Sequence, residues 1–202
     1  NEQILLQSSG SGGAKGNPLW EVVLEPESKI LVGPHEIRSR LKFKINNTFT
    51  GSDAITGAGN TISMSTDYKD FKNQNYWNVL IQRTSGPSGS HWGDDLNTSH
   101  SYQMYIGESK SDKLRVFEAV SMSYGGSDYS HSAANFIGTG SRVAGTTGGN
   151  LIFGKTMTGS LAEIRAWKYP LSASVFKQHI YDKKSVVGND ATDSQTNLIY
   201  HY

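Results

Sequence analysis

Short stretches in which apolar and polar residues alternate one by one recur along the chain, and they constrain its fold more than any other feature. Successive side chains of a β-strand point to opposite faces of a sheet, so this alternation predicts strands with one buried face. Trp20, Val22 and Leu24, for example, alternate with Glu21 and Glu25. Similar stretches lie at residues 77–82, 102–106, 114–116, 120–122 and 151–153. Clusters of Gly, Asn, Asp and Ser separate them, as is typical of antiparallel strands. The sequence therefore predicts an all-β sandwich of two antiparallel sheets.

The length and the cysteine content of the chain fit a single domain held together by its core. The chain has 202 residues and no cysteine. At this length folding buries roughly 70% of the surface of the unfolded chain, so no disulfide is needed. We expect one domain over residues 1–202, with a flexible glycine-rich segment at 8–16 and the start of a following segment at 196–202. Because the chain begins with Asn and has no signal-peptide pattern, we expect a piece of a longer protein. The absence of cysteine excludes disulfides, cysteine-ligated zinc and thiol catalysis.

The charge of the chain is nearly balanced, with 19 basic and 18 acidic side chains and a net charge of +1. No overall field therefore attracts nucleic acid or an anionic membrane. The apolar runs are only a few residues long, whereas a membrane-spanning helix needs roughly 20. We expect neither nucleic-acid binding nor membrane insertion.

The apolar period changes from two to between three and four near the C-terminal end. Val175, Phe176, His179 and Ile180 follow Ser172 at spacings that place them on one face of a short helix. The Ser172 hydroxyl can cap the first turn by accepting a hydrogen bond from a backbone amide. We expect His179 to be packed or hydrogen-bonded on this face rather than to bind a ligand.

The strand expected just before this helix contains a fault in its alternation. Ile164 and Ala166 share one face, but Leu161 falls on the other, so either Leu161 is exposed or a bulge separates it from Ile164. We favour the bulge, because one inserted residue corrects the facing without breaking the pairing. Proline has no amide to donate, so Tyr169 and Pro170 are expected to end the strand.

Residues 159–180, GSLAEIRAWKYPLSASVFKQHI, resemble the closing motif of laminin-G-like domains in the concanavalin-A-like lectin and glucanase superfamily. Residues 76–83, YWNVLIQR, and 102–107, YQMYIG, resemble two further strands of that family in the same order. The resemblance covers roughly residues 70–182 and implies a two-sheet jelly roll with one short C-terminal helix. It is closest to domains embedded in tail or other virion polypeptides of bacteriophages, and it implies packing roles for Arg165 and Trp167.

The acidic residues do not form the pattern that glycoside hydrolysis requires. A retaining glycosidase holds two carboxyl groups about 5–5.5 Å apart, and the related glucanases place Glu-x-Asp on one strand. Here Glu25 and Glu27 flank a proline, while Glu21 and Glu163 are isolated. We therefore expect that the protein is not an enzyme.

Glu118 is an acidic residue that the alternation directs toward the interior. It shares its parity with Leu114, Val116, Val120 and Met122. Because a single carboxylate is not an acid pair, we expect Glu118 to be hydrogen-bonded or exposed at an edge rather than catalytic.

The loop at residues 84–101 is much longer than an ordinary hairpin connection, and loops of this length are often functional. Four of its side chains suit the apolar face and the hydroxyls of a sugar: Trp92, Asp94, Asn97 and His100. Asp94 and Asp95 could instead be oxygen ligands of calcium, and apart from calcium we expect no cofactor. The alternative is a polar loop whose Trp packs on the rim of the sandwich.

A second loop, at residues 124–131, offers a similar set of side chains around a Gly-Gly turn. Tyr124, Asp128 and Tyr129 are its candidates for binding a glycan. The same residues are also compatible with an ordinary hairpin turn.

Four basic residues alternate with apolar ones along residues 37–45. Arg38, Arg40, Lys42 and Lys44 should therefore project from one face, as a ladder about 20 Å long. Such a ladder could bind anionic groups of a surface glycan or an acidic neighbouring subunit. The alternative is a solvated outer face whose charges prevent edge-to-edge association.

Taken together, the residues and the resemblance predict a non-catalytic structural or glycan-binding module of a phage virion protein. Its partners would be host-surface carbohydrate or other virion subunits. The alternative is a carbohydrate-binding or adhesion module of a bacterial surface protein, located outside the cell or on its surface.

Overall fold

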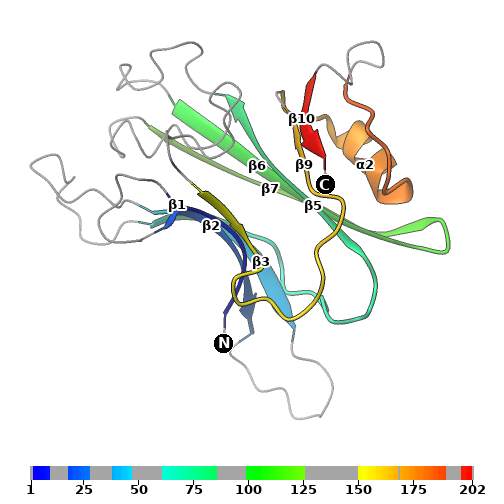
Figure 1. Ribbon diagram of the computed structural model, residues 1–202, viewed down its shortest axis with the longest axis horizontal. Helices are drawn as coiled ribbons and strands as arrows, with labels where there is room; N and C mark the ends of the chain where they lie inside the picture. Colours follow the sequence, from blue (N-terminus) through cyan, green and yellow to red (C-terminus); the bar gives the residue numbers. More distant parts are fainter. Residues whose placement is uncertain are drawn as a thin grey trace, which may run out of the picture.

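The computed structural model describes residues 2–9, 18–27, 38–46, 61–85, 99–125, 150–167, 169–189 and 197–201. These residues form two antiparallel sheets, a separate two-stranded ribbon and a short helix (Figure 1). The all-β prediction with one short helix near the C-terminal end is therefore confirmed at this level.

The larger sheet has five strands in the order β4-β3-β2-β1-β8. Their bounds are β1 Gln3–Ser9, β2 Pro18–Pro26, β3 Ser39–Asn46, β4 Thr61–Ser65 and β8 Asn150–Phe153. The smaller sheet has the order β5-β6-β7, with β5 Trp77–Ser85, β6 Ser99–Lys110 and β7 Lys113–Gly125. The ribbon consists of β9 Arg165–Trp167 and β10 Leu198–His201.

The main core lies between the two sheets. Phe43 of β3 is fully buried, and its ring centroid is 6.2 Å from that of Trp20 in β2 and 5.7 Å from that of Tyr102 in β6. Six further buried residues complete this core: Val22, Leu41, Ile45, Met64, Met104 and Ile106. Burying apolar side chains from both sheets is the dominant favourable contribution to their packing.

The predicted helix is confirmed as α2, Ala173–Tyr181, and it covers the outer face of the smaller sheet (Figure 1). Ser172 Oγ accepts a hydrogen bond of 3.3 Å from the Val175 amide, as a capping serine does. The helix approaches β6 so closely that a Cβ atom on Gly107 would lie 2.1 Å from Ile180 Cδ1. Glycine at this position therefore lets the helix lie on the sheet.

The strand predicted ahead of α2 is shorter than expected, and the predicted bulge between Leu161 and Ile164 is wrong. Residues 161–164 precede β9 without joining a sheet, and Leu161 is 43% exposed. Glu163 has a φ of 55°, in the left-handed region that non-glycine residues seldom adopt. The chain thus changes direction at Glu163 and begins to pair only at Arg165.

Leu114 also departs from the face that its parity indicates. It packs against the cluster of Tyr105, Phe176 and Ile180 on the helix side of the smaller sheet. The pairing of β6 with β7 shifts between Glu108 and Ser109, which is a β-bulge or a similar irregularity. Such a shift reverses the facing of the residues beyond it.

Candidate functional site

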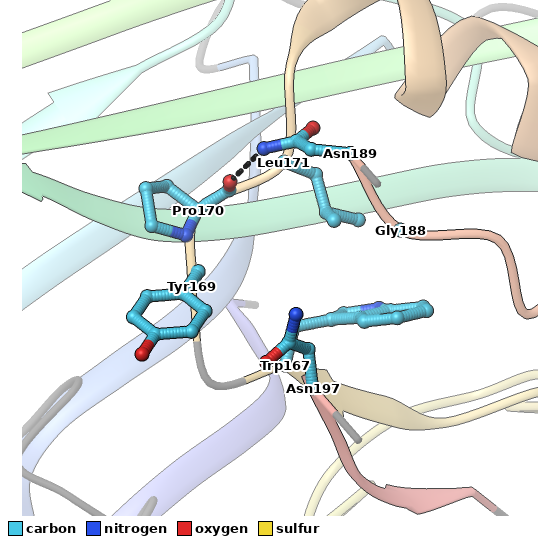
Figure 2. Close-up of a pocket in the computed structure, with 7 residues that line it drawn as sticks. All are labelled: Trp167, Tyr169, Pro170, Leu171, Gly188, Asn189 and Asn197. Atoms are coloured by element: carbon cyan, nitrogen blue, oxygen red, sulfur yellow. Dashed lines mark hydrogen bonds between the residues drawn. The ribbon is translucent and has the colours of Figure 1, made fainter. Parts of the chain in front are cut away.

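A pocket of about 270 Å³ lies where the ribbon, the segment before α2 and the segment after α2 meet (Figure 2). Seven described residues line it: Trp167, Tyr169, Pro170, Leu171, Gly188, Asn189 and Asn197. Three of the seven carry a ring and two carry a carboxamide. Apolar ring surfaces and a few polar groups thus meet in a small pocket, a combination that can contact a small ligand.

Trp167 forms one wall of the pocket from the end of β9. Its ring centroid is 5.8 Å from that of His179 in α2, so the indole packs against the helix as well as lining the pocket. Figure 2 shows the indole edge-on, with Leu171 and Gly188 on one side of its plane. The packing role expected for Trp167 and its position in the pocket are therefore compatible.

Leu171, on the opposite wall, is fixed by the side-chain amide of Gln82 from β5. The Leu171 N–H donates to Gln82 Oε1 at 2.8 Å, and Gln82 Nε2 donates to the Leu171 carbonyl at 3.0 Å. Gln82 thus pairs with the backbone of residue 171 as a neighbouring strand would. Both side chains are buried, and this pairing satisfies backbone groups that water does not reach.

Asn189 holds the same segment from the other side. Its Nδ2 donates to the Pro170 carbonyl at 2.7 Å, and its Oδ1 accepts from the Ser172 amide at 2.7 Å. Pro170, Leu171 and Ser172 are thus fixed by two side-chain amides, from Gln82 and Asn189. The pocket wall is fixed in position before any ligand binds.

His179 is buried behind Trp167 and hydrogen-bonded, as the sequence predicts. Its Nε2 donates to the Val187 carbonyl at 2.7 Å, which joins α2 to the segment that supplies Gly188 and Asn189. Burial lowers the pKa of the imidazole below its ordinary value of 6.5, because the charged form loses contact with water.

We expect His179 to make the protein less stable as the pH falls from about 7 to about 5. The pKa is lower in the folded than in the unfolded chain, so the unfolded chain binds the proton first and unfolding is favoured on acidification. Urea denaturation of the wild type and of His179→Gln at both pH values measures this effect. The glutamine variant should lose part of the pH dependence, and an identical pH dependence in both proteins would contradict the prediction.

The residues predicted to bind glycan or calcium in the two long loops are mostly outside the described part of the chain. Six of them lie there: Trp92, Asp94, Asp95, Asn97, Asp128 and Tyr129. The backbone of the other two is described, and His100 of β6 pairs with Tyr124 of β7. The start of β6 and the end of β7, where the two predicted loops attach, therefore lie side by side at one end of the smaller sheet.

Three residues of the basic ladder have acidic partners, two of them on the neighbouring strand β2 and one just before β1. Arg40 Nε lies 2.5 Å from a Glu25 carboxylate oxygen, and Lys42 Nζ lies 3.8 Å from the other. Lys44 Nζ lies 2.8 Å from Glu2 and 3.4 Å from Glu21. The hydrogen bond from Arg40 lowers the pKa of the Glu25 carboxyl.

Arg38, which begins the ladder, is exposed. For the three members within β3, the predicted placement on the face opposite the core is confirmed, because the alternating Leu41, Phe43 and Ile45 are buried. Since Arg40, Lys42 and Lys44 lie beside carboxylates, their field at a distance is reduced. An external anionic partner for this face stays a prediction.

Two acidic residues of the smaller sheet, Glu118 and Glu108, are held by a cation or by amides. Glu118 accepts a hydrogen bond of 2.7 Å from the Asp67 amide and lies 2.8 Å from Lys69 Nζ, which confirms that it is hydrogen-bonded. Buried Glu108 accepts hydrogen bonds from the side-chain amides of Asn73 and Asn75. Within the described segments, no group of three or more His, Asp or Glu side chains could hold a metal ion.

The sequence reasoning missed the pocket as a site. Its one local signal is the group of rings at Trp167, Tyr169 and Pro170, which the alternation alone marks as the end of a strand. Asn189 and Asn197 reach the pocket only through the folding of distant segments.

No helix in the described part of the chain is long and apolar enough to cross a membrane.

Comparison of the chain with models of protein families, with curated proteins and with solved structures finds no match.

Proposed function

We propose that the domain is a non-catalytic carbohydrate-binding module and that a sugar residue binds in the pocket beside Trp167. The observation that carries the proposal is the combination of the Trp167 indole with the amide of Asn197 in one pocket of about 270 Å³. A pyranose has an apolar face of C–H groups and a rim of hydroxyls. The indole suits the face, and a carboxamide can both donate to and accept from the rim.

Salt bridges made by three of the described carboxylates support a non-catalytic role. Glu25, Glu118 and Glu163 each lie beside a cationic side chain, at 2.5, 2.8 and 2.8 Å. A general acid must be protonated at its working pH, whereas Arg40 lowers the pKa of Glu25, and His201 and Arg165 lower that of Glu163. None of these three carboxylates lines the pocket.

We further propose that the two sheets form a concanavalin-A-like jelly roll and that the domain belongs to a virion protein of a bacteriophage. The support is the resemblance of residues 159–180, 76–83 and 102–107 to laminin-G-like domains of that kind. In this setting the sugar would belong to a glycan on the surface of the host. Removing the domain from the particle would then weaken attachment to host cells.

Trp167→Ala should weaken glycan binding by about tenfold or more, because the loss of about 1.5 kcal/mol of ring contact corresponds to such a factor. The experiment is a glycan array of bacterial surface oligosaccharides probed with the full chain, followed by calorimetry on the oligosaccharide that binds most tightly. Tyr181→Ala is the matched control, because Tyr181 is 52% exposed and does not line the pocket. It should bind as the wild type does.

Trp92→Ala and Tyr129→Ala test the sites predicted in the long loops. If they abolish binding while Trp167→Ala does not, the sugar binds at the loops, and the assignment to the pocket is wrong. If the wild type binds no oligosaccharide on the array, the proposal of a carbohydrate-binding module fails.

A further inference from the structure

Two of the pocket residues depend on the ribbon for their position. Trp167 is the last residue of β9, and Asn197 directly precedes β10, whose Leu198 pairs with Trp167. The ribbon belongs to neither of the two larger sheets (Figure 1). Two strands alone are marginally stable in water, so something else must help to keep β10 on β9.

The side chain of Glu163 connects the pieces of the ribbon. Its Oε2 accepts hydrogen bonds from His201 Nε2 at 2.7 Å and from Arg165 Nη2 at 2.8 Å. Arg165 Nη2 also donates to the Lys183 carbonyl in the segment after α2. One carboxylate thus bonds to β9 and β10, and through Arg165 it is linked to the segment that leads to the pocket residues Gly188 and Asn189.

The backbone conformation at Glu163 is a second observation, independent of the hydrogen bonds that its side chain makes. Its φ of 55° is unfavourable for a residue with a β-carbon, and glycine would adopt it without strain. The side chain is thus kept at a backbone position that glycine would occupy more easily, which is consistent with a role beyond the turn itself. The pKa of the Glu163 carboxyl is lowered by the hydrogen bond from His201 and then by that from Arg165, which agrees with a carboxylate held by cations.

We infer that Glu163 is a positioning residue for the pocket: by holding His201 and Arg165 it keeps β10 on β9 and so fixes Asn197 beside Trp167. The carboxylate does not line the pocket, so it acts through the ribbon. As a role in ligand binding, this inference rests on the proposed function. Its structural part, the placement of Trp167 and Asn197, can be measured without a ligand.

The first experiment is amide hydrogen exchange of β10 in Glu163→Gly and Glu163→Gln. Glycine relieves the backbone strain and removes the carboxylate, whereas glutamine keeps the shape and removes the charge. We expect the amides of residues 198–201 to exchange several-fold faster in both variants, with little change in the exchange of β6. Unchanged exchange in β10 would overturn the inference, because Glu163 would then matter only for the backbone turn.

The second experiment follows the indole N–H signal of Trp167 by NMR, assigned with Trp167→Phe. We expect it to shift in Glu163→Gly and in His201→Ala, but to stay close to the wild type in His201→Gln, which keeps a donor for the carboxylate. Glu25→Gln removes a carboxylate paired with Arg40 in the larger sheet and serves as the control. An indole signal that does not respond to Glu163→Gly would overturn the inference.

Measuring glycan binding by the wild type and by Glu163→Gly distinguishes a failure of this inference from a failure of the proposed function. If the wild type binds an oligosaccharide and Glu163→Gly binds it several-fold more weakly, the positioning role in binding is supported. If Glu163→Gly binds as tightly as the wild type although β10 is loosened, that role is wrong and the module still binds sugar. If no oligosaccharide binds and the Trp167 signal still shifts, Glu163 positions the pocket but the proposed function fails.

Discussion

Phe43→Ala should lower the free energy of unfolding by about 3–5 kcal/mol, the usual loss when a fully buried phenylalanine is truncated. Phe43 has no exposed surface, and its ring lies between Trp20 of its own sheet and Tyr102 of the facing sheet. Truncation removes apolar contacts on both sides and leaves a cavity at the centre of the core. The measurement is the urea midpoint of unfolding, with an unchanged dependence of the free energy on urea concentration.

Phe153→Ala is the matched control for this truncation. Phe153 lies in the same sheet but is 40% exposed, so its loss should cost much less than that of Phe43. Similar losses in the two variants would mean that the space between the sheets is not the main source of stability.

The alternation in the sequence predicts the faces of the strands well where the strands are long and regularly paired. In β3, Leu41, Phe43 and Ile45 are buried while Arg40, Lys42 and Lys44 project from the other face. The reason is that the period of a strand is fixed by its backbone geometry, so local sequence is sufficient.

Departures from the prediction occur where pairing is irregular. Leu161 is exposed because the chain turns at Glu163, and Leu114 changes face where the pairing of β6 and β7 shifts. Both depend on the backbone conformation of single residues. The alternation of apolar and polar side chains does not report the backbone conformation of a single residue.

The pocket could be predicted only in part. Trp167 and the helix with its capping Ser172 follow from local patterns. Gln82 and Asn189, which fix the pocket wall, are 89 and 19 residues from the backbone groups that they bind. Interactions between such distant residues arise from the fold as a whole.

Gln82→Met is the second substitution for which we expect a large effect, a loss of about 2–4 kcal/mol in the free energy of unfolding. Methionine has nearly the same shape, so the packing between β5 and residue 171 is kept while the hydrogen bonds are removed. The N–H and the carbonyl of Leu171 then lose their 2.8 Å and 3.0 Å partners in a buried place. Each buried group left without a partner costs about 1–3 kcal/mol.

Gln178→Met is the control for Gln82→Met, because Gln178 lies on the exposed face of α2 and the same change there should alter stability by less than about 0.5 kcal/mol.

Gln82→Met should also weaken glycan binding in the pocket, since Leu171 and the neighbouring Pro170 form one of its walls. Urea denaturation and calorimetry with the same oligosaccharide measure the two effects separately. A variant as stable as the wild type would show that the side chain of Gln82 is not what holds residue 171 on the sheet.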